Sequence, residues 1–211
     1  MQPAIPASPS AELQGLFGAI DIYLFDQLAR GAFDERRRVL DAGCGSGRNL
    51  PYFLQRGFEV FAADSDAASV SAVRRLVARL APALPPENVR TAPLDALPWP
   101  DGSMDVVVCS AVLHFADDER HFGRIVEELW RVLAPGGLFF ARLASSIGIA
   151  HLLDAPSGRV RLPDGTDRFV VSEEMLLAWN ERLGARVLEP LKTTNVQNQR
   201  CMTTWVLERH V

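Results

Sequence analysis

Hydrophobic and polar positions change their rhythm along the chain, and these changes predict its secondary structure. Residues 11–30 place apolar side chains at helical spacing, which predicts one or two amphipathic helices ended by Gly31. From residue 39 onward, short apolar runs alternate with helical patterns. The predicted strands are 39–42, 58–63, 89–92, 105–111 and 138–143, and the predicted helices are 48–56, 67–80 and 118–133.

This alternation predicts an α/β fold with a mostly parallel sheet and helices on both faces. The run 105–111 contains VVVC, so we expect this strand to be covered on both faces. After Ser145 the rhythm changes, and the Asp-Gly pair at 164–165 predicts a hairpin. A helix over 172–183 is followed by predicted strands at 185–196 and 202–209, which their short connection makes antiparallel.

Composition and charge exclude several classes of protein. A chain of 211 residues with 48% hydrophobic content can form one domain with a sizeable core. The net charge of −4 gives no basic excess that favours nucleic acid or an anionic membrane. The longest apolar run is far shorter than the roughly 20 residues of a membrane span, and the first 15 residues do not resemble a signal peptide.

The cysteines and histidines indicate neither a disulfide framework nor a metal site. Cys44, Cys109 and Cys201 are odd in number and far apart, which favours a reducing, cytoplasmic location. The four histidines are equally scattered and show no metal-ligand spacing. We therefore expect no metal.

The segment VLDAGCGSGRNL, residues 39–50, places Gly43, Gly45 and Gly47 at every second position between a predicted strand and a predicted helix. Glycines let a ligand approach the backbone, and the helix N-terminus offers free N–H groups, although a tight structural turn would show the same pattern. The spacing differs from the dinucleotide fingerprint G-x-G-x-x-G and suits a smaller charged group. Asp64 ends the next strand, where an acid can accept hydrogen bonds from ribose hydroxyls.

Four motifs together resemble the class I S-adenosylmethionine-dependent methyltransferases. They are VLDAGCGSGRN, the acid at 64, the segment 94–115 that contains LPWPDGSMDVVVCSAVLHF, and ELWRVLAPGGLFF at 128–140. The resemblance covers about residues 35–145. It implies a Rossmann-like, doubly wound, seven-stranded sheet whose last strand is antiparallel. It also implies S-adenosylmethionine as the methyl donor and S-adenosylhomocysteine as the product.

The resemblance implies roles for particular residues. The three glycines would line the methionine end of the donor, and Asp64 would hold the ribose diol with Ser65 beside it. Asp95 would contact the adenine amine, flanked by Leu94 and Ala96. Ser110 and His114 would lie where donor and acceptor meet. The implied cofactor-binding set is Asp41, Gly43, Cys44, Gly45, Gly47, Asp64, Ser65, Leu94, Asp95, Ala96 and Ser110.

His114 and Arg142 each allow more than one interpretation. His114 is the candidate catalytic base because imidazole titrates near neutrality, but the same position suits a pocket wall or simple packing. Arg142 ends a strand above the expected pocket and could receive an anionic substrate. A solvated charge, or a pair with a protein carboxylate such as Asp117 or Asp154, would explain Arg142 equally well. Tyr23 and Ser145 complete the predicted substrate pocket.

The domain plan follows from these patterns. Residues 1–10 hold three prolines and two serines, which predicts a disordered arm before a single domain at 11–211. Within that domain, 11–31 is the predicted helical lid and 145–171 the predicted insertion over the acceptor site. So small a cap favours a small-molecule acceptor, possibly anionic, over a protein or nucleic acid.

Three functions compete at this stage. The first is methyl transfer to a small molecule by in-line displacement, a reaction that asks the enzyme mainly for proximity and alignment. The second is a non-catalytic module that binds S-adenosylmethionine. The third is a nicotinamide-dependent oxidoreductase, against which the glycine spacing counts.

Overall fold

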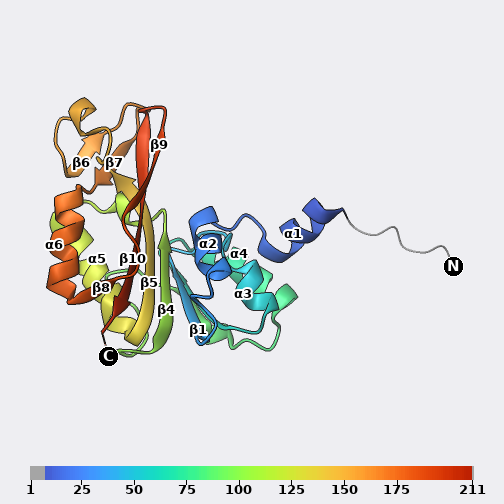
Figure 1. Cartoon of the computed structure of the whole chain (residues 1–211). Coiled ribbons are helices and arrows are strands. Elements are labelled where there is room, and N and C mark those ends of the chain that lie inside the picture. Colours follow the sequence, from blue (N-terminus) through green and yellow to red (C-terminus); the bar gives the residue numbers. More distant parts are fainter. Residues whose placement is uncertain (1–7, 211) are drawn as a thin grey trace.

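The computed structural model describes residues 8–210, and a twisted sheet forms the centre of the molecule (Figure 1). The predicted arm falls mainly on residues 1–7, outside the described residues, and residues 9 and 10 already belong to the first helix. The strands are β1 Arg38–Ala42, β2 Glu59–Asp64, β3 Val89–Thr91, β4 Met104–Ser110, β5 Leu133–Ser145, β6 Gly158–Arg161, β7 Asp167–Val170, β8 Ala185–Val187, β9 Lys192–Val196 and β10 Arg200–Arg209.

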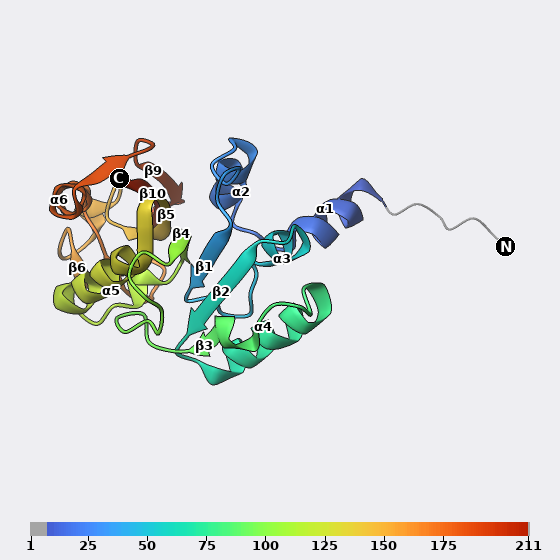
Figure 2. The same cartoon turned by 90° about the horizontal axis from the view of Figure 1, so that it is seen from below.

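Eight strands form the main sheet in the order β3-β2-β1-β4-β5-β10-β8, with β9 also paired to β10 (Figure 2). Strands β1 to β5 run parallel, whereas β10 is antiparallel to β5, β8 and β9. The predicted Rossmann-like fold with an antiparallel end is therefore confirmed. The predicted strand 185–196 is two strands instead, interrupted around Pro190, and each pairs with a different part of β10.

Five of the six α-helices in residues 8–210 begin where a short polar side chain caps them, whereas the helix Pro51–Gln55 follows Leu50 without such a cap. Side chains of Ser8, Asp21, Asp66, Asp118 and Ser172 each accept a hydrogen bond from an N–H of the first turn. The α-helices are α1 Pro9–Phe17, α2 Ile22–Ala29, α3 Pro51–Gln55, α4 Ala67–Leu80, α5 Glu119–Val132 and α6 Glu173–Leu183, and the 3₁₀ helices are η1 Pro86–Asn88, η2 Leu113–Phe115 and η3 Ala150–Leu152.

The helices form a layer on each face of the sheet (Figures 1 and 2). Strand β4 shows why: Val106 and Val108 pack with α2, α3 and α4, while Val107 and Cys109 pack with α5 and α6. Complete burial of each valine side chain contributes about 1.5–3 kcal/mol. The VVVC run is therefore covered on both faces, as its composition predicts. Within residues 8–210, no helix has the length and apolar composition needed to cross a bilayer.

Two starts differ by three residues or more from the sequence prediction. Helix α3 begins at Pro51, because residues 45–49 form a turn instead of the first helical residues. Strand β5 begins at Leu133 and takes up the APGG segment, with a register shift between Met104 and Val106 of β4. A Cβ at Gly137 would lie 2.6 Å from the Leu133 side chain, so only glycine fits that bulge.

Candidate functional site

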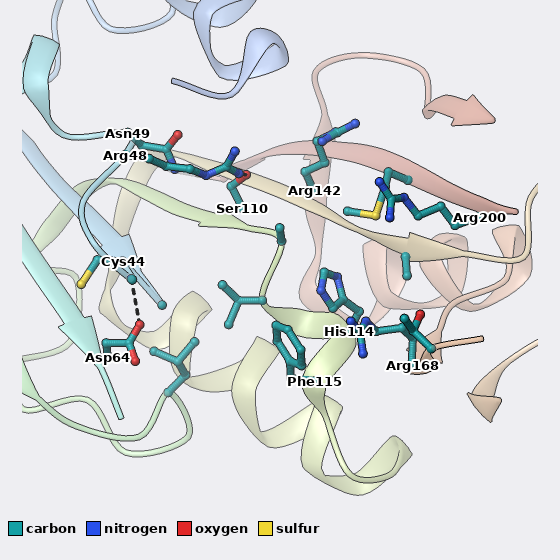
Figure 3. Close-up of a pocket in the computed structure, with 18 of the residues that line it drawn as sticks. Cys44, Arg48, Asn49, Asp64, Ser110, His114, Phe115, Arg142, Arg168 and Arg200 are labelled. Atoms are coloured by element: carbon teal, nitrogen blue, oxygen red, sulfur yellow. Dashed lines mark hydrogen bonds between the residues drawn. The ribbon is translucent and has the colours of Figure 1, made fainter. Parts of the chain in front are cut away.

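A cavity of about 740 Å³ opens at the carboxyl ends of β1, β2, β4 and β5, where parallel sheets bind ligands (Figure 3). We distinguish two sides of it by their residues. The glycine side consists of Gly43, Cys44, Gly45, Ser46, Arg48, Asn49, Asp64, Ser65, Leu94, Ser110, Ala111 and Val112. The arginine side consists of His114, Phe115, Arg142, Ala144, Leu162, Asp164, Thr166, Arg168, Val196, Arg200 and Met202.

The loop that contains Gly43, Gly45 and Gly47, here called the glycine loop, is held against the end of β2. The backbone N–H groups of Gly43 and Cys44 both donate to the carbonyl of Ala63, at 2.8 and 3.0 Å. A Cβ at Gly43 would lie 2.4 Å from Val112 Cγ2, so this glycine is required by packing. At Gly45 φ is +50°, and a Cβ would meet no atom within 4 Å. Gly45 thus leaves open space at the wall of the cavity.

Asp64 joins the end of β2 to this loop. Its Oδ2 accepts a hydrogen bond from the Gly45 N–H at 2.8 Å (Figure 3). Its Oδ1 accepts one from the Asp66 N–H at 2.9 Å. The carboxylate is only partly buried, and it lines the cavity together with Ser65. Asp64 therefore both shapes the loop and faces the space beside it.

Asp41 and Gly47 support the loop from behind and are absent from the cavity lining. A Cβ at Gly47 would lie 3.0 Å from Leu76 Cδ2 of α4, so this position permits helix packing. Asp41 is buried, and its Oδ2 has no hydrogen-bond partner among residues 8–210. Burial raises the pKa of Asp41 to about 7, although Arg48 and Asn49 oppose the shift.

The predicted adenine contacts lie further out. Leu94 lines the cavity, whereas Asp95 and Ala96 do not. The Asp95 carboxylate instead accepts a hydrogen bond from Arg124 Nε of α5 at 3.1 Å, and Ala96 is exposed. Of this predicted group, the structure brings only Leu94 to the cavity wall.

His114 lies in η2 on the arginine side and is 7% exposed. Its ring centroid lies 4.5 Å from that of Phe115, and its Nδ1 has no hydrogen-bond partner in the described part of the chain. Burial lowers the pKa of His114 to about 4, and the nearby charges of Arg168 and Arg200 contribute to the shift. At neutral pH the imidazole is therefore uncharged and a weak base.

Arg142 reaches the cavity, but its guanidinium also contacts α2. Its Nη1 donates to Asp21 Oδ2 at 3.4 Å, and the guanidinium lies 5.2 Å from the centre of the Tyr23 ring. The carboxylate partner is thus Asp21, not Asp117 or Asp154. Tyr23 and Ser145 are not in the lining: the Tyr23 hydroxyl contacts Thr194 Oγ1 at 2.5 Å, and the buried Ser145 hydroxyl contacts Thr203 Oγ1 at 2.6 Å.

Asp21 is a residue of the site that the sequence analysis did not single out. Its carboxylate is 1% exposed and accepts a hydrogen bond from Ser110 Oγ at 3.0 Å, and its Oδ2 lies 3.5 Å from Arg48 Nη2. Its other oxygen caps α2 at the Tyr23 N–H. An Asp before an amphipathic helix signals the cap, but not the contact with a strand 89 residues away.

Comparison with known proteins agrees with this geometry. Residues 40–141 match the family described as "Methyltransferase domain". A probable S-adenosylmethionine-dependent methyltransferase of Mycolicibacterium smegmatis is 35% identical over 120 residues, which are 57% of this chain and 43% of that protein. A malonyl-[acyl-carrier protein] O-methyltransferase of Enterobacter lignolyticus is 34% identical over 109 residues, 51% of this chain and 39% of that protein.

Solved structures extend the likeness beyond the matched segment. The 1,6-didemethyltoxoflavin-N1-methyltransferase of Burkholderia thailandensis, solved with 1,6-didemethyltoxoflavin and S-adenosylhomocysteine bound, superposes with a TM-score of 0.66 at 18% identity, covering 100% of this chain and 94% of that one. The chain spans about two fifths of the length of the curated relatives given above. Residues 40–141 thus match the methyltransferase domain family, and the chain shares the fold of solved S-adenosylmethionine-dependent methyltransferases.

Proposed function

We propose that this chain transfers a methyl group from S-adenosylmethionine to a small-molecule acceptor. The observation that carries the proposal is the pairing of Gly45 with Asp64 at the carboxyl end of the sheet. A loop whose backbone is open to the cavity lies beside a carboxylate at the end of the next strand. This arrangement suits a nucleoside that carries a short charged chain.

The donor would occupy the glycine side. Its methionine end would lie against Gly43 and Gly45, and its ribose hydroxyls would donate to Asp64. Leu94 offers an apolar contact for the base. Ser110 and Arg48 are joined by a hydrogen bond of 2.9 Å and line the same wall, where the guanidinium can meet a carboxylate.

The reaction needs little acid–base catalysis from these residues. An electron pair of the acceptor attacks the methyl carbon, the carbon–sulfur bond breaks, and its electrons remain on sulfur. The enzyme contributes mainly by holding acceptor, methyl carbon and sulfur in line. Since His114 is a weak base, acceptors that arrive with a free electron pair are favoured. We assign His114 to the cavity wall between donor and acceptor.

The acceptor would enter from the arginine side. The predicted lid segment 11–31 covers most of α1 and all of α2 but supplies no residue to the lining, whereas the 145–171 segment supplies Leu162, Asp164, Thr166 and Arg168. A cavity of about 740 Å³ has the volume of a small-molecule site, so we propose neither a nucleic-acid nor a membrane partner. We place the reaction in the cytoplasm, because Cys44, Cys109 and Cys201 are free thiols.

Calorimetry tests donor binding directly. The protein should bind S-adenosylmethionine and S-adenosylhomocysteine and should show no comparable heat with NAD. Tight NAD binding without either sulfur nucleoside would overturn the proposal. Incubation with methyl-labelled donor and small-molecule extract then separates an enzyme from a binding module, because only an enzyme yields labelled product.

A further inference from the structure

The arginine side contains two guanidinium groups that approach from separate hairpins (Figure 3). Arg168 belongs to β7 and Arg200 is the first residue of β10. The two residues are 32 positions apart in sequence, and both lower the pKa of His114 through their charge. They are therefore close to the same part of the cavity.

Arg168 has no carboxylate partner in the part of the chain that the structure describes. Its Nη1 donates to the backbone carbonyl of Asp167 at 2.8 Å, and its guanidinium lies 5.1 Å from the centre of the Phe115 ring. The neighbouring Arg161 is different, since it pairs with the Asp167 carboxylate at 3.3 Å and does not line the cavity. Arg168 is thus a partly buried cation with its charge directed to the cavity.

Arg200 meets one carboxylate at a long distance. Its Nη1 lies 3.6 Å from Asp164 Oδ2, while Asp164 Oδ1 accepts hydrogen bonds from the Thr166 N–H and hydroxyl at 2.9 and 2.6 Å. Thr166, and with a smaller effect Arg200 and Arg168, hold the pKa of Asp164 below its usual range. One carboxylate thus faces two guanidinium groups, which leaves a single positive charge in excess.

The third arginine of the arginine side, Arg142, is already in contact with a carboxylate. Arg142 contacts Asp21 through Nη1 and stacks on the Tyr23 ring, although its buried Nε has no hydrogen-bond partner in residues 8–210. His114 adds no charge at neutral pH and is more than nine-tenths buried, with Nδ1 lacking a partner in residues 8–210. The excess positive charge of this side is therefore carried by Arg168 and Arg200.

Apolar side chains share the cavity lining with these two arginines. Leu162, Val196, Met202 and Phe115 line the same part of the cavity. Phe115 is 56% exposed and Val196 40% exposed, although both are large hydrophobic residues. Exposed apolar surface beside a ligand cavity marks a place where an apolar group of a partner molecule is buried.

We propose, on the basis of the proposed methyltransferase function, that the acceptor is an organic acid with an apolar body, whose carboxylate is held by Arg168 and Arg200. A single excess charge matches a carboxylate better than a phosphate dianion. A guanidinium also presents paired donors that fit the two carboxylate oxygens. The apolar body would lie against Phe115 and Val196.

The test titrates probe pairs into the protein saturated with S-adenosylhomocysteine. Octanoate is compared with octanamide and 3-phenylpropanoate with 3-phenylpropanamide, so that each pair differs in charge and little in shape. We expect each acid to bind at least about tenfold more tightly than its amide. Arg168→Gln and Arg200→Gln should each remove most of this preference, whereas Arg161→Gln, on the same hairpin but outside the cavity, should retain it.

Three results would overturn the proposal. They are equal binding of acid and amide by the wild type, equal losses in the Arg161 and Arg168 variants, and tighter binding of octyl phosphate than of octanoate. Binding of S-adenosylhomocysteine is measured in every variant first. If the wild type binds S-adenosylhomocysteine but does not prefer acids over amides, this inference alone fails. If the wild type does not bind S-adenosylhomocysteine, the proposed function fails.

Discussion

The glycine side of the cavity comes from the ends of β2 and β4 and from the segments that follow β1, β2, β3 and β4. The arginine side collects residues from η2, β5 and two hairpins of the second half of the chain. On the glycine side, backbone N–H groups and the Asp64 carboxylate define the shape. On the arginine side, long cationic side chains and apolar groups define it. A common donor needs a fixed frame, and a variable acceptor is served by side chains that can change without disturbing that frame.

One buried group near each side of the cavity has a shifted pKa, and the two shifts have opposite directions. Asp41 behind the glycine side has its pKa raised to about 7, and His114 on the arginine side has its pKa lowered to about 4. In both cases burial is the largest cause, because it disfavours the charged form of each group. Charge is therefore costly behind the glycine loop and beside the arginines for the same physical reason.

The largest effect on donor binding is expected at Gly45. Gly45→Val should weaken donor binding by more than about 100-fold, because the side chain would fill open space at the glycine side. Gly57→Val is the matched control, since Gly57 also has a positive φ, +74°, and open space but lies outside the cavity. Both variants carry backbone strain of roughly 1–2 kcal/mol, and calorimetry should show lost binding only for Gly45. Normal binding by Gly45→Val would reduce the loop to a structural turn.

Asp64→Ala should have the next largest effect on donor binding. Loss of hydrogen bonds to a charged acceptor costs roughly 1.5–3 kcal/mol, which corresponds to about 10- to 150-fold weaker donor binding. Asp66→Ala is the control, because Asp66 caps α4 through Ala68 and Ser69 and does not line the cavity. The control should lower thermal stability and leave the donor dissociation constant unchanged. Equal dissociation constants for Asp64→Ala and the wild type would remove the carboxylate from the donor site.

Asp41→Asn tests the buried carboxylate behind the loop. Because the folded pKa of about 7 lies above the ordinary value of 3.8, the native state binds more protons between these values and loses stability as pH rises through 7. The variant should exceed the wild type in free energy of unfolding by on the order of 4 kcal/mol at pH 8 and match it near pH 4. Urea unfolding at both pH values measures this. A difference of equal size at both would exclude titration of Asp41 as its cause.

The same urea unfolding measurements, made between pH 4 and 6.5, test the pKa shift of His114. Its folded pKa of about 4 lies below the ordinary 6.5, so the unfolded chain binds more protons in that range and stability falls as pH drops from 6.5 to 4. In the wild type the slopes of Asp41 and His114 oppose each other there. In Asp41→Asn, stability should therefore rise between pH 4 and 6.5.

Local signals explain which parts of the fold the sequence predicts well. Helix α4 spans Ala67–Leu80 as expected, because Asp66 caps its start and its apolar residues keep one period. The start of strand β5 differs from the prediction, because it depends on the pairing of Leu133 with Met104 of β4 and on the register shift that follows, which no local pattern encodes. The glycine side was predictable for the same kind of local reason as α4, because its central motif is contiguous in sequence.

The arginine side depends on contacts that no local pattern encodes. In β7 successive side chains point to opposite faces, so a shift of one residue would exchange Arg168 with Asp167 at the cavity. The pairing with β6 sets that register. Likewise, Arg142 and Asp21 are 121 residues apart and meet only because α2 packs over the ends of the strands. Arg168 and Arg200 could therefore be distinguished from ordinary surface charge only in the folded structure.

The smallest expected effect concerns Arg142. It tests whether Arg142 is held by Asp21 while Arg168 and Arg200 bind the acceptor. Because Arg142 contacts the buried Asp21 at 3.4 Å, Arg142→Met should lower the free energy of unfolding of the ligand-free protein by about 1 kcal/mol. For a domain of this size, that change lowers the melting temperature by roughly 2–4 °C. Ser110 and Arg48 remain beside Asp21, which keeps the loss small. Adding Asp21→Asn should recover part of it, since the uncompensated carboxylate is then removed. If Arg142→Met leaves the melting temperature unchanged and instead abolishes acid binding, then Arg142 receives the acceptor and this assignment fails.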